Sequence, residues 1–597
     1  EHAIKVKPDY PEAYHNLGTA LNETENYKRA IRVHKKTLIL KPDFAEANNN
    51  IGVSFAALKL SEQAIRNYNK ALTIKPNYPS AFRNLTIPLM EIKPIEYSQR
   101  LTENYLTALN YENILNPTKA SSAIIGLLKH NDIVKDSIIR SREDTLTQSC
   151  VEICSKLLEL PLLLKIMTLS HIPDLEIEEL LKKLRKVLLL QRDSLAKDST
   201  LLLFQSALAL QCFTNEFIYE ETEEERTALE VLVAKLQKLS TEGKQLSPYE
   251  VACIASYRSL SIYDWLPRTA PHKDLEALFK RQITEVEREA ELKKDIQTLH
   301  SIQNEVSLEV QNQYEENPYP RWINLRLEST PRSINDIVKK LDLKVSNAAN
   351  TFSTSPEILI AGCGTGQHAL TTASRFKNST VTAIDLSLAS LAYAKRKTKE
   401  LDVENIEYIQ ADILDLGMLN KTFDIVESAG VLVCLDDPFA GWKVLTDCLK
   451  FNGLMKVGLY SELARQEVVR AREMIAERQI SSNREDMIQF RQEIIKDGNP
   501  ILNNLKHSND FYTTSTLRDS LFHVKEHRFT IPQIKLMLND LKLTFVGFEF
   551  SNKDIPNLFK KTYSDEEAMY DLDKWHEFET LNPMTFASMY QFWLQKL

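Results

Sequence analysis

Residues 357–385 read EILIAGCGTGQHALTTASRFKNSTVTAID. A first apolar run leads into three glycines, Gly362, Gly364 and Gly366, and a second apolar run, Thr380 to Ile384, ends on Asp385. Glycine lets the backbone approach a ligand closely, and a carboxylate after the second strand can accept both hydroxyls of a ribose. The pattern therefore predicts a nucleotide-binding βαβ unit that recognises adenosine.

The glycine spacing bears on which adenosine cofactor is bound. Residues 362–366 read G-x-G-x-G and lack the final glycine of the dinucleotide fingerprint. Two further strands, at 406–410 and 423–426, are followed by Asp412-Ile413 and Glu427-Ser428. Three more strands are predicted at 454–460, 543–550 and 590–594. This order resembles class I S-adenosylmethionine-dependent methyltransferases. A dehydrogenase-like fold is the alternative, and the closing pair of strands argues against it.

The resemblance implies a seven-stranded α/β Rossmann-like domain over residues 301–597 and S-adenosyl-L-methionine as cofactor. In that family the first acid, here Asp385, holds the ribose, and the Asp412-Ile413 pair lies against the adenine. The loop from Glu427 to Gly430 is expected near the methionine and the substrate. The expected cofactor contacts are Ala361, Gly362, Cys363, Gly364, Thr365, Gly366, Asp385, Leu386, Asp412, Ile413 and Glu427.

A repeat with a spacing of 34 residues marks the N-terminus. The motif Lys-Pro-Asp/Asn-Tyr/Phe recurs at residues 7–10, 41–44 and 75–78. The period resembles the tetratricopeptide repeat, a helix hairpin that needs about three stacked copies to bury its apolar face. Two copies are complete, the first six residues match the end of a preceding copy, and Thr86-Ile87-Pro88 is expected to interrupt the third. We expect residues 1–90 to form a repeat array truncated at its N-terminus.

Repeat arrays present a concave surface, which predicts docking of a protein or peptide partner. A rigid spacer or a self-association surface is the alternative. Residues 91–300 are Leu-rich and are expected to form a helical middle domain without a catalytic motif. All-α elements followed by an α/β methyltransferase domain make up the predicted multidomain fold.

Length and composition limit the class of protein and the cellular compartment that we expect. The chain has 597 residues, enough for about three to four domains, and 43% of them are hydrophobic. It has no run long enough to cross a bilayer and no secretory signal, and it begins at Glu1, as a fragment would. Seven scattered cysteines without a metal-ligand pattern predict a reducing cytoplasm and no metal. The net charge of −8 argues against nucleic-acid binding.

Two charged runs stand out. The acidic run Glu220–Glu225 is expected to be a solvated helix start, with a basic partner as the alternative. The basic residues 395–399 are expected to lie on a solvated helix face.

We expect the residues that contact the methyl acceptor to come from segments outside the core strands. Tyr319 and Trp322 precede the core and could cover a cofactor or substrate, or simply pack on the core. Between the fifth and sixth strands a helical insertion at about 462–540 is far longer than the 2–6 residues of an ordinary connection, and we expect a lid over the acceptor. Its ends offer Tyr460, Tyr512 and Arg528 as substrate contacts.

Residues 523–527 of this insertion read His-Val-Lys-Glu-His. The spacing matches an inverted zinc-protease motif, but the segment closes at Pro532 and offers no further ligand. A base or a substrate hydrogen-bond donor is more plausible than a metal site, because neutral imidazole can take a proton near pH 7. A purely structural hydrogen bond is the alternative. The candidate catalytic residues are His523, Glu526 and His527.

Together these features predict a methyltransferase acting on an unidentified acceptor, with the repeats docking a protein. A scaffold that binds the cofactor without turnover is the alternative. Oxygen, nitrogen and carbon acceptors all stay open, as does the oligomeric state.

Overall fold

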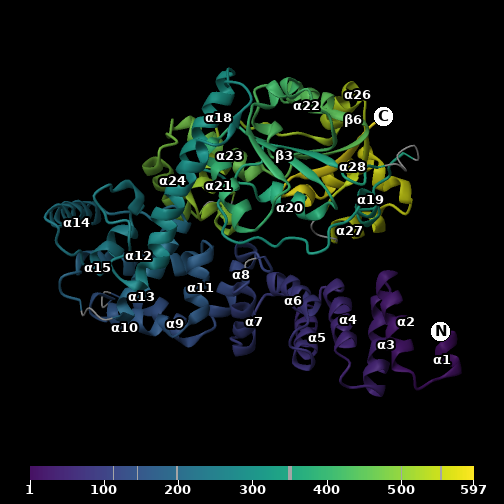
Figure 1. Ribbon diagram of the computed structural model, residues 1–597, viewed down its shortest axis with the longest axis horizontal. Helices are drawn as coiled ribbons and strands as arrows, with labels where there is room; N and C mark the ends of the chain where they lie inside the picture. The colour runs from purple at the N-terminus through teal and green to yellow at the C-terminus, as the bar shows by residue number, and fades with distance from the viewer. Residues whose placement is uncertain (112, 144–145, 196–198, 347–351, 499–500, 551–553) are drawn as a thin grey trace.

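The structure combines an all-helical half with a half built on a mixed sheet (Figure 1). This computed structural model describes residues 1–597 apart from 112, 144–145, 196–198, 347–351, 499–500 and 551–553. The helices run along the lower part of Figure 1 from the N-terminus, and the sheet lies above them. Within the described residues, no helix has both the length and the apolar composition needed to cross a bilayer.

The 34-residue repeat folds into antiparallel helix pairs, and its small residues lie where helices touch. A Cβ added to Gly18 would lie 2.5 Å from Nε2 of His34, and one added to Gly52 would lie 2.6 Å from Cε1 of Tyr68. The helices are α1 (His2–Val6), α2 (Pro11–Glu23), α3 (Tyr27–Leu40), α4 (Ala45–Ala57), α5 (Ser61–Ile74) and α6 (Pro79–Glu91).

The third repeat keeps its first helix. α6 continues through Pro88, with Leu85 and Leu89 both buried on its inner face. The predicted interruption at Thr86-Ile87-Pro88 is therefore wrong. Burial of this face outweighs the one backbone hydrogen bond that proline removes.

The repeats continue into a larger helical body. One hydrophobic core extends from Ala64 in α5 to Tyr219, and a second core surrounds Leu232 and Phe279. The helices are α7 (Gln99–Leu109), α8 (Pro117–Leu128), α9 (Asp132–Ser141), α10 (Leu146–Leu158), α11 (Pro161–Leu169), α12 (Leu175–Leu190), α13 (Ser199–Thr214), α14 (Glu223–Thr241), α15 (Pro248–Ala255), α16 (Glu276–Phe279) and α17 (Glu285–Lys293), with short turns η1 (Leu260–Ile262), η2 (Lys273–Leu275) and η3 (Lys280–Thr284).

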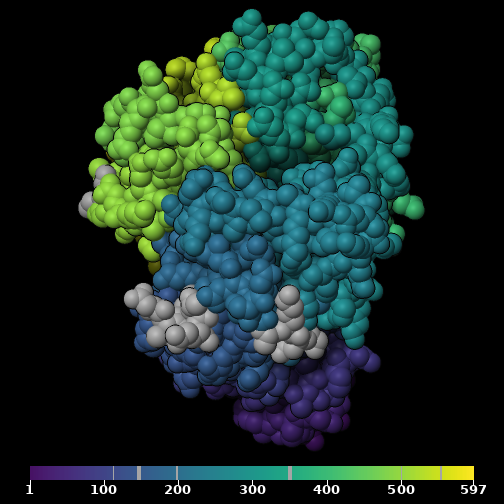
Figure 2. All heavy atoms as spheres, turned by 90° about the vertical axis from the view of Figure 1, so that its left-hand side faces the viewer, coloured from purple at the N-terminus to yellow at the C-terminus, as the bar shows by residue number. Residues whose placement is uncertain are grey.

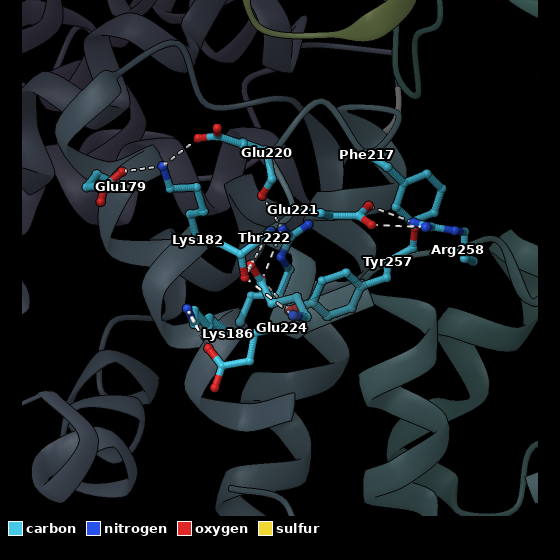
Figure 3. A network of polar contacts seen from close by, with 12 residues as sticks. Glu179, Lys182, Lys186, Phe217, Glu220, Glu221, Thr222, Glu224, Tyr257 and Arg258 are labelled. Carbon is cyan, nitrogen blue, oxygen red and sulfur yellow. Dashed lines mark hydrogen bonds and ion pairs between the residues drawn. The ribbon is translucent and has the colours of Figure 1, made fainter. Parts of the chain in front are cut away.

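The acidic run at 220–225 begins α14, but part of it is buried (Figure 3). Thr222 and Glu225 form a reciprocal capping box. Glu225 is 2% exposed and accepts a hydrogen bond from the hydroxyl of Tyr257, while Glu221 pairs with Arg258 at 2.6 Å. The expectation of a solvated helix start is wrong for these two acids, because an arginine and a phenol from other segments satisfy them.

The basic run at 395–399 likewise turns inward in part. Arg396 lies 3.3 Å from Glu285 and 2.9 Å from Glu289, and its side chain is 8% exposed. These two acids belong to α17, so the ion pairs join the helical half to the helix after β3. The expected solvated face is wrong at Arg396 for this reason.

The sheet has the strand order β1-β4-β3-β2-β5-β6-β8-β7. β8 runs antiparallel to β6 and β7, and the other neighbouring pairs are parallel. All seven predicted strands are present, and a two-residue strand at the edge was not predicted. The strands are β1 (Gln297–Thr298), β2 (Glu357–Ala361), β3 (Thr380–Asp385), β4 (Ile406–Gln410), β5 (Phe423–Ala429), β6 (Leu449–Leu459), β7 (Leu543–Phe548) and β8 (Tyr590–Lys596).

Helices cover both faces of the sheet, because β2 buries alternate residues on opposite sides. Ile358 and Ile360 pack with α19, α20 and α21, and Leu359 and Ala361 pack with the core that contains α22, α26 and α28. The helices and turns of this half are α18 (Glu305–Glu316), α19 (Ile334–Lys340), α20 (Gln367–Arg375), α21 (Leu388–Glu400), η5 (Ile413–Leu419), η6 (Leu432–Cys434), α22 (Pro438–Asp447), α26 (Ile531–Leu541), α27 (Asp554–Thr562), η9 (Glu566–Tyr570), α28 (Leu572–Leu581) and η10 (Pro583–Phe586).

The segment between β6 and α26 packs away from the sheet. Its buried residues, among them Phe490, Ile494 and Leu517, belong to the same hydrophobic core as α5 to α13. We call this segment, residues 462–530, the insertion; α26 itself packs beside β7 and α28. The insertion contains α23 (Gln466–Glu477), α24 (Arg484–Lys496), η7 (Asn503–His507), η8 (Asn509–Phe511) and α25 (Thr514–Leu521).

Candidate functional site

A cavity of ≈ 260 Å³ opens at the carboxyl ends of β2, β3, β4 and β5. Ligands of open α/β sheets bind at this edge, where loops from neighbouring strands diverge. One end of the cavity is lined by the glycine loop and by acids that follow the strands. The other end is lined by aromatic side chains and by one carboxyl group from the insertion, Asp519.

The glycine loop adopts a backbone that side chains disfavour. Gly362, Gly364 and Gly366 have φ angles of +77°, +51° and +85°. A Cβ at Gly362 would lie 2.3 Å from Cγ2 of Val431, and one at Gly364 would lie 2.5 Å from the carbonyl oxygen of Tyr319. Glycine is therefore required at these positions, both for conformation and for space.

Two acids stand beside this loop, after β3 and β4, which lie on the same side of β2 in the sheet. Asp385 accepts hydrogen bonds from the backbone N–H groups of Gly364 at 2.8 Å and Ser387 at 3.0 Å, and burial raises its pKa to about 6. Asp412 follows β4, lines the cavity and accepts the N–H of Leu414 at 3.0 Å. Each carboxylate keeps lone pairs for a ligand hydroxyl or amino group.

Glu427 on β5 lies behind the cavity wall rather than in it. Its Oε2 lies 2.7 Å from Nε2 of His368 and accepts the hydroxyl of Thr372 at 2.7 Å. Burial alone would raise the pKa of Glu427, but the hydrogen bond and charge of His368 and the charge of Lys456 lower it to about 2. Glu427 thereby fixes the ring of His368, which does line the cavity.

The segment before the sheet rests on the glycine loop, and we call residues 317–323 the strap. Its Tyr319 carbonyl accepts the N–H of Thr365 at 3.3 Å, and the Pro320 carbonyl accepts the hydroxyl of Thr365. The indole N–H of Trp322 donates to the Thr365 carbonyl at 3.1 Å. The strap therefore closes over the loop and brings the ring of Tyr319 to the cavity.

The far end of the cavity holds a hydrogen-bonded chain of three side chains. Tyr314 donates its hydroxyl to Oδ1 of Asp519 at 2.6 Å, and Nε2 of His523 lies 3.1 Å from the Tyr314 oxygen. Nδ1 of His523 accepts the N–H of Lys525, so Nε2 carries the proton of the neutral ring. Burial lowers the pKa of His523 to about 4 and raises that of Asp519 to about 6. The hydrogen bond from His523 to Tyr314 and the one from Tyr314 to Asp519 are therefore both donated in the direction of Asp519.

Among the described residues, no group of three or more His, Cys, Asp or Glu side chains is placed to hold a metal ion.

Comparison with known proteins identifies the centre of this half. A family model described as a methyltransferase domain matches residues 358–453, from β2 into β6. Residues 358–453 form a methyltransferase domain. A tetratricopeptide-repeat model matches residues 45–78, which are α4 and α5 with their flanking turns.

The individual relatives of this chain are distant. An uncharacterized Synechococcus protein is 28% identical over 241 residues, 38% of this chain and 58% of that protein. A Paenibacillus malonyl-[acyl-carrier protein] O-methyltransferase is 32% identical over 88 residues, 14% of this chain and 32% of that protein. PKMT2 of Rickettsia typhi, solved with AdoHcy, is 17% identical with a TM-score of 0.35, covering 46% of this chain and 54% of that one. The chain thus spans between a third and three fifths of these proteins.

The residues of the cavity fit S-adenosylmethionine, the cofactor of this domain. Most of the predicted cofactor contacts line the cavity: Gly362, Cys363, Gly364, Asp385, Leu386, Asp412 and Ile413. Ala361, Thr365, Gly366 and Glu427 lie behind it. Ala361 is buried in β2, Thr365 faces the strap, and Gly366 begins α20 against Ala394.

The predicted substrate residues divide in the same way. Tyr319 and Tyr460 line the cavity. Trp322 is a buried residue of the strap with its indole N–H donated to the Thr365 carbonyl, and Tyr512 is buried in the helical core with its hydroxyl donated to the Lys506 carbonyl. Arg528 pairs with Glu462 at 3.0 Å and does not reach the cavity. These last three residues do not line the cavity, and a role for them in substrate binding stays a prediction.

The predicted catalytic residues lie behind the cavity wall. Glu526 pairs with Arg465 at 2.7 Å, and Arg465 stacks on the ring of Tyr460, 3.8 Å from its centroid. The backbone of His527 donates to the Val433 carbonyl. His523 is connected to the cavity only through Tyr314. None of the three lines the cavity, and a role for them as bases stays a prediction.

Sequence reasoning did not select Tyr314 and Asp519, the two hydrogen-bonded residues at the far end of the cavity, as site residues. It also missed His368. His368 could have been found, because it stands two residues after the glycine loop at the start of a helix. Asp519 could not, because its position depends on how the insertion packs.

Proposed function

We propose that this chain transfers a methyl group from S-adenosylmethionine to an amine. The observation that carries the proposal is one cavity with an adenosine-type site at one end and, at the other, the Asp519 carboxyl among the rings of Tyr314, Tyr319 and Tyr460. An alkylammonium group is attracted both by a carboxylate and by aromatic faces. A hydroxyl acceptor would gain little from the rings.

When bound, the cofactor supplies a methyl group on a positively charged sulfur and leaves as S-adenosylhomocysteine. On the protein side, Asp385 would hold the ribose, Asp412 and Ile413 the adenine, and the glycine loop would allow close approach of the backbone. The ring of His368, fixed by Glu427, would border the methionine part. Holding the two reactants together could supply about 7–11 kcal/mol of the barrier reduction.

An amine attacks only after it loses a proton, and Asp519 would take it. A carboxyl group with a pKa of about 6 is ionised near neutrality yet more basic than an ordinary aspartate. The hydroxyl of Tyr314 holds the carboxylate in place, and His523 in turn orients that hydroxyl. Arg465, paired with Glu526, would steady Tyr460 in the wall opposite.

The tetratricopeptide repeats would dock the protein that carries the amine or one that delivers it. What supports this part of the proposal is the repeat array itself, which shares a core with the helical body and, through that body, with the insertion.

The cofactor end is tested by calorimetric titration of the whole chain with S-adenosylhomocysteine. Asp385→Asn should lose about tenfold or more in affinity, the usual cost of a hydrogen bond to a charged group. Asp447→Asn, an exposed acid on α22, is the matched control and should bind as the unaltered chain does. Absence of binding to the folded, unaltered chain would refute the proposal.

The acceptor end is tested with S-adenosylmethionine labelled in its methyl group. Three synthetic peptide pools with blocked termini offer lysine, hydroxyl side chains or carboxyl side chains as the nucleophile. Label in the lysine pool alone, lost in Asp519→Asn, is the expected result. Label in either other pool would show that the amine assignment is wrong while leaving the transferase assignment intact.

A further inference from the structure

Two walls of the acceptor end come from segments outside the sheet. The strap carries Tyr319, and helix α25 of the insertion carries Asp519. These two segments are about 200 residues apart in the chain, and they meet a third segment, the turn that follows α13 in the helical half.

One residue of that turn, Glu216, contacts both walls. Its Oε2 accepts the backbone N–H of Ser515 in the first turn of α25 at 2.5 Å, and its backbone carbonyl accepts the hydroxyl of Thr514 at 2.9 Å. Its Oε1 lies 3.3 Å from Nε of Arg321, two residues after Tyr319. The side chain of Glu216 is 9% exposed. A buried carboxylate thus accepts a hydrogen bond from a backbone N–H at the start of α25 and forms an ion pair with the strap.

The backbone that presents Glu216 is strained. Glu216 and Phe217 have φ angles of +58° and +57°, so two successive residues with side chains adopt the left-handed conformation. Such residues are rare and persist where surrounding contacts over-determine them. Here the N–H of Phe217 bonds to the carbonyl of Cys212 at 2.7 Å, which turns the chain back toward the strap.

The same junction is open to solvent. A cleft of ≈ 560 Å³ is lined by Glu216 together with Arg321 of the strap and Arg518 of α25. Figure 2 shows a hollow where the light-green insertion, the teal segment near residue 300 and the blue helical half meet. Arg518 precedes Asp519 directly, so the cleft and the acceptor end of the cavity lie on adjacent residues of one helix.

We propose that Glu216 is a positioning residue for the acceptor end, so that the helical half completes the site in which the methyl group is transferred. This rests on the proposed function. The hydrogen bond of Glu216 to Ser515 fixes the position of the start of α25 and therefore of Asp519. Its ion pair with Arg321 fixes the position of the strap and therefore of Tyr319. Asp385 and Asp412 of the cofactor end are held by backbone N–H groups of the loops after β2, β3 and β4, so the strap is what connects Glu216 with that end.

The test compares Glu216→Ala, Glu216→Gln and a matched control, Glu220→Ala, in the whole chain. Glu220 lies on the same connection but contacts Lys182 and not the walls of the cavity. Glutamine keeps an oxygen that can accept the Ser515 N–H, so Glu216→Gln should retain most of the exchange protection and of the kcat that Glu216→Ala loses. Each variant is measured by titration with S-adenosylhomocysteine, by hydrogen exchange of the peptide 514–521, and by kcat and KM with the labelled lysine pool.

In Glu216→Ala we expect exchange over 514–521 to accelerate about tenfold, as expected when a hydrogen bond to a charged group is lost. We expect kcat to fall by up to about a hundredfold, as small misplacements can cause. The affinity for S-adenosylhomocysteine and the KM for S-adenosylmethionine should change by less than kcat does, because Glu216 reaches the glycine loop through the strap and not directly. Wild-type exchange in Glu216→Ala, or a loss of cofactor affinity as large as the loss of kcat, would overturn the proposal.

The two proposals fail separately. If the unaltered chain does not bind S-adenosylhomocysteine, the transferase function fails while the exchange comparison still decides whether Glu216 holds α25. If binding and transfer occur and Glu216→Ala changes neither exchange nor kcat, only the positioning role fails.

Discussion

Arg491 in the insertion and Glu178 in α12 form a bidentate ion pair with both N–O distances at 2.7 Å. The side chain of Arg491 is 0% exposed and that of Glu178 is 6% exposed. Nε of Arg491 also donates to the carbonyl of Phe511 at 2.6 Å. This pair fastens the insertion to the helical half inside their common core.

Removing one member of this pair should destabilise the protein strongly. Arg491→Met leaves the Glu178 carboxylate buried without its partner, which costs about 3–5 kcal/mol. The midpoint of urea unfolding followed by circular dichroism measures the loss. Arg478→Met, which removes an exposed pair with Glu493 on the same insertion, should cost less than about 1 kcal/mol. Equal losses in the two variants would contradict the argument.

The glycine loop should not tolerate a methyl group at Gly364. Gly364→Ala combines a positive φ with a Cβ 2.5 Å from the Tyr319 carbonyl, so loop and strap must separate. We expect the affinity for S-adenosylhomocysteine to fall by about tenfold or more, since backbone strain of this kind costs about 1–3 kcal/mol. Gly417→Ala is the control, because a Cβ there meets no atom within 4 Å.

Asp519→Asn should raise stability while abolishing transfer. Burial raises the pKa of Asp519 from 3.8 to about 6, so its contribution to stability is fully present below about pH 3.8 and is lost as the pH rises through 6. At pH 8 the variant should therefore be more stable by up to about 3 kcal/mol, and at pH 4 the difference should nearly vanish. Urea titrations at the two pH values decide; a gain of equal size at both would contradict the burial argument.

Two helical glycines, Gly18 in the repeats and Gly126 in the helical body, should respond oppositely to replacement by alanine. Gly18→Ala places a Cβ 2.5 Å from the ring of His34 and should cost about 1–3 kcal/mol by overpacking. Gly126→Ala in α8 meets only Cδ of Pro94 at 3.7 Å and should gain about 0.5–1 kcal/mol from helix propensity. Thermal unfolding of both variants measures the difference in sign.

Local chemistry explains which parts could be predicted from sequence. The glycine loop with Asp385 is one compact motif, and the seven strands follow from apolar runs whose order is typical of one fold. Arg396 was expected in solvent because a basic run on a helix usually is solvated. Its partners, Glu285 and Glu289, lie more than 100 residues away, and nothing in the local pattern points to them.

The acceptor end illustrates the same limit more sharply. His523, Glu526 and His527 attracted notice because titratable side chains cluster in that short segment. The residue that faces the cavity, Asp519, stands alone in an ordinary helical pattern. Its place is set by burial of the insertion on α12 and α13, a contact between segments some 300 residues apart.

The position of β8 has a consequence for synthesis on the ribosome. β8 lies between β6 and β7, so one edge of β6 stays unpaired while the 130 residues from 460 to 589 are added. At 5–20 residues per second this takes about 7–26 s. An unpaired apolar strand edge is a template for aggregation during that time. A nascent chain of this protein should therefore depend on chaperones until its closing strand emerges.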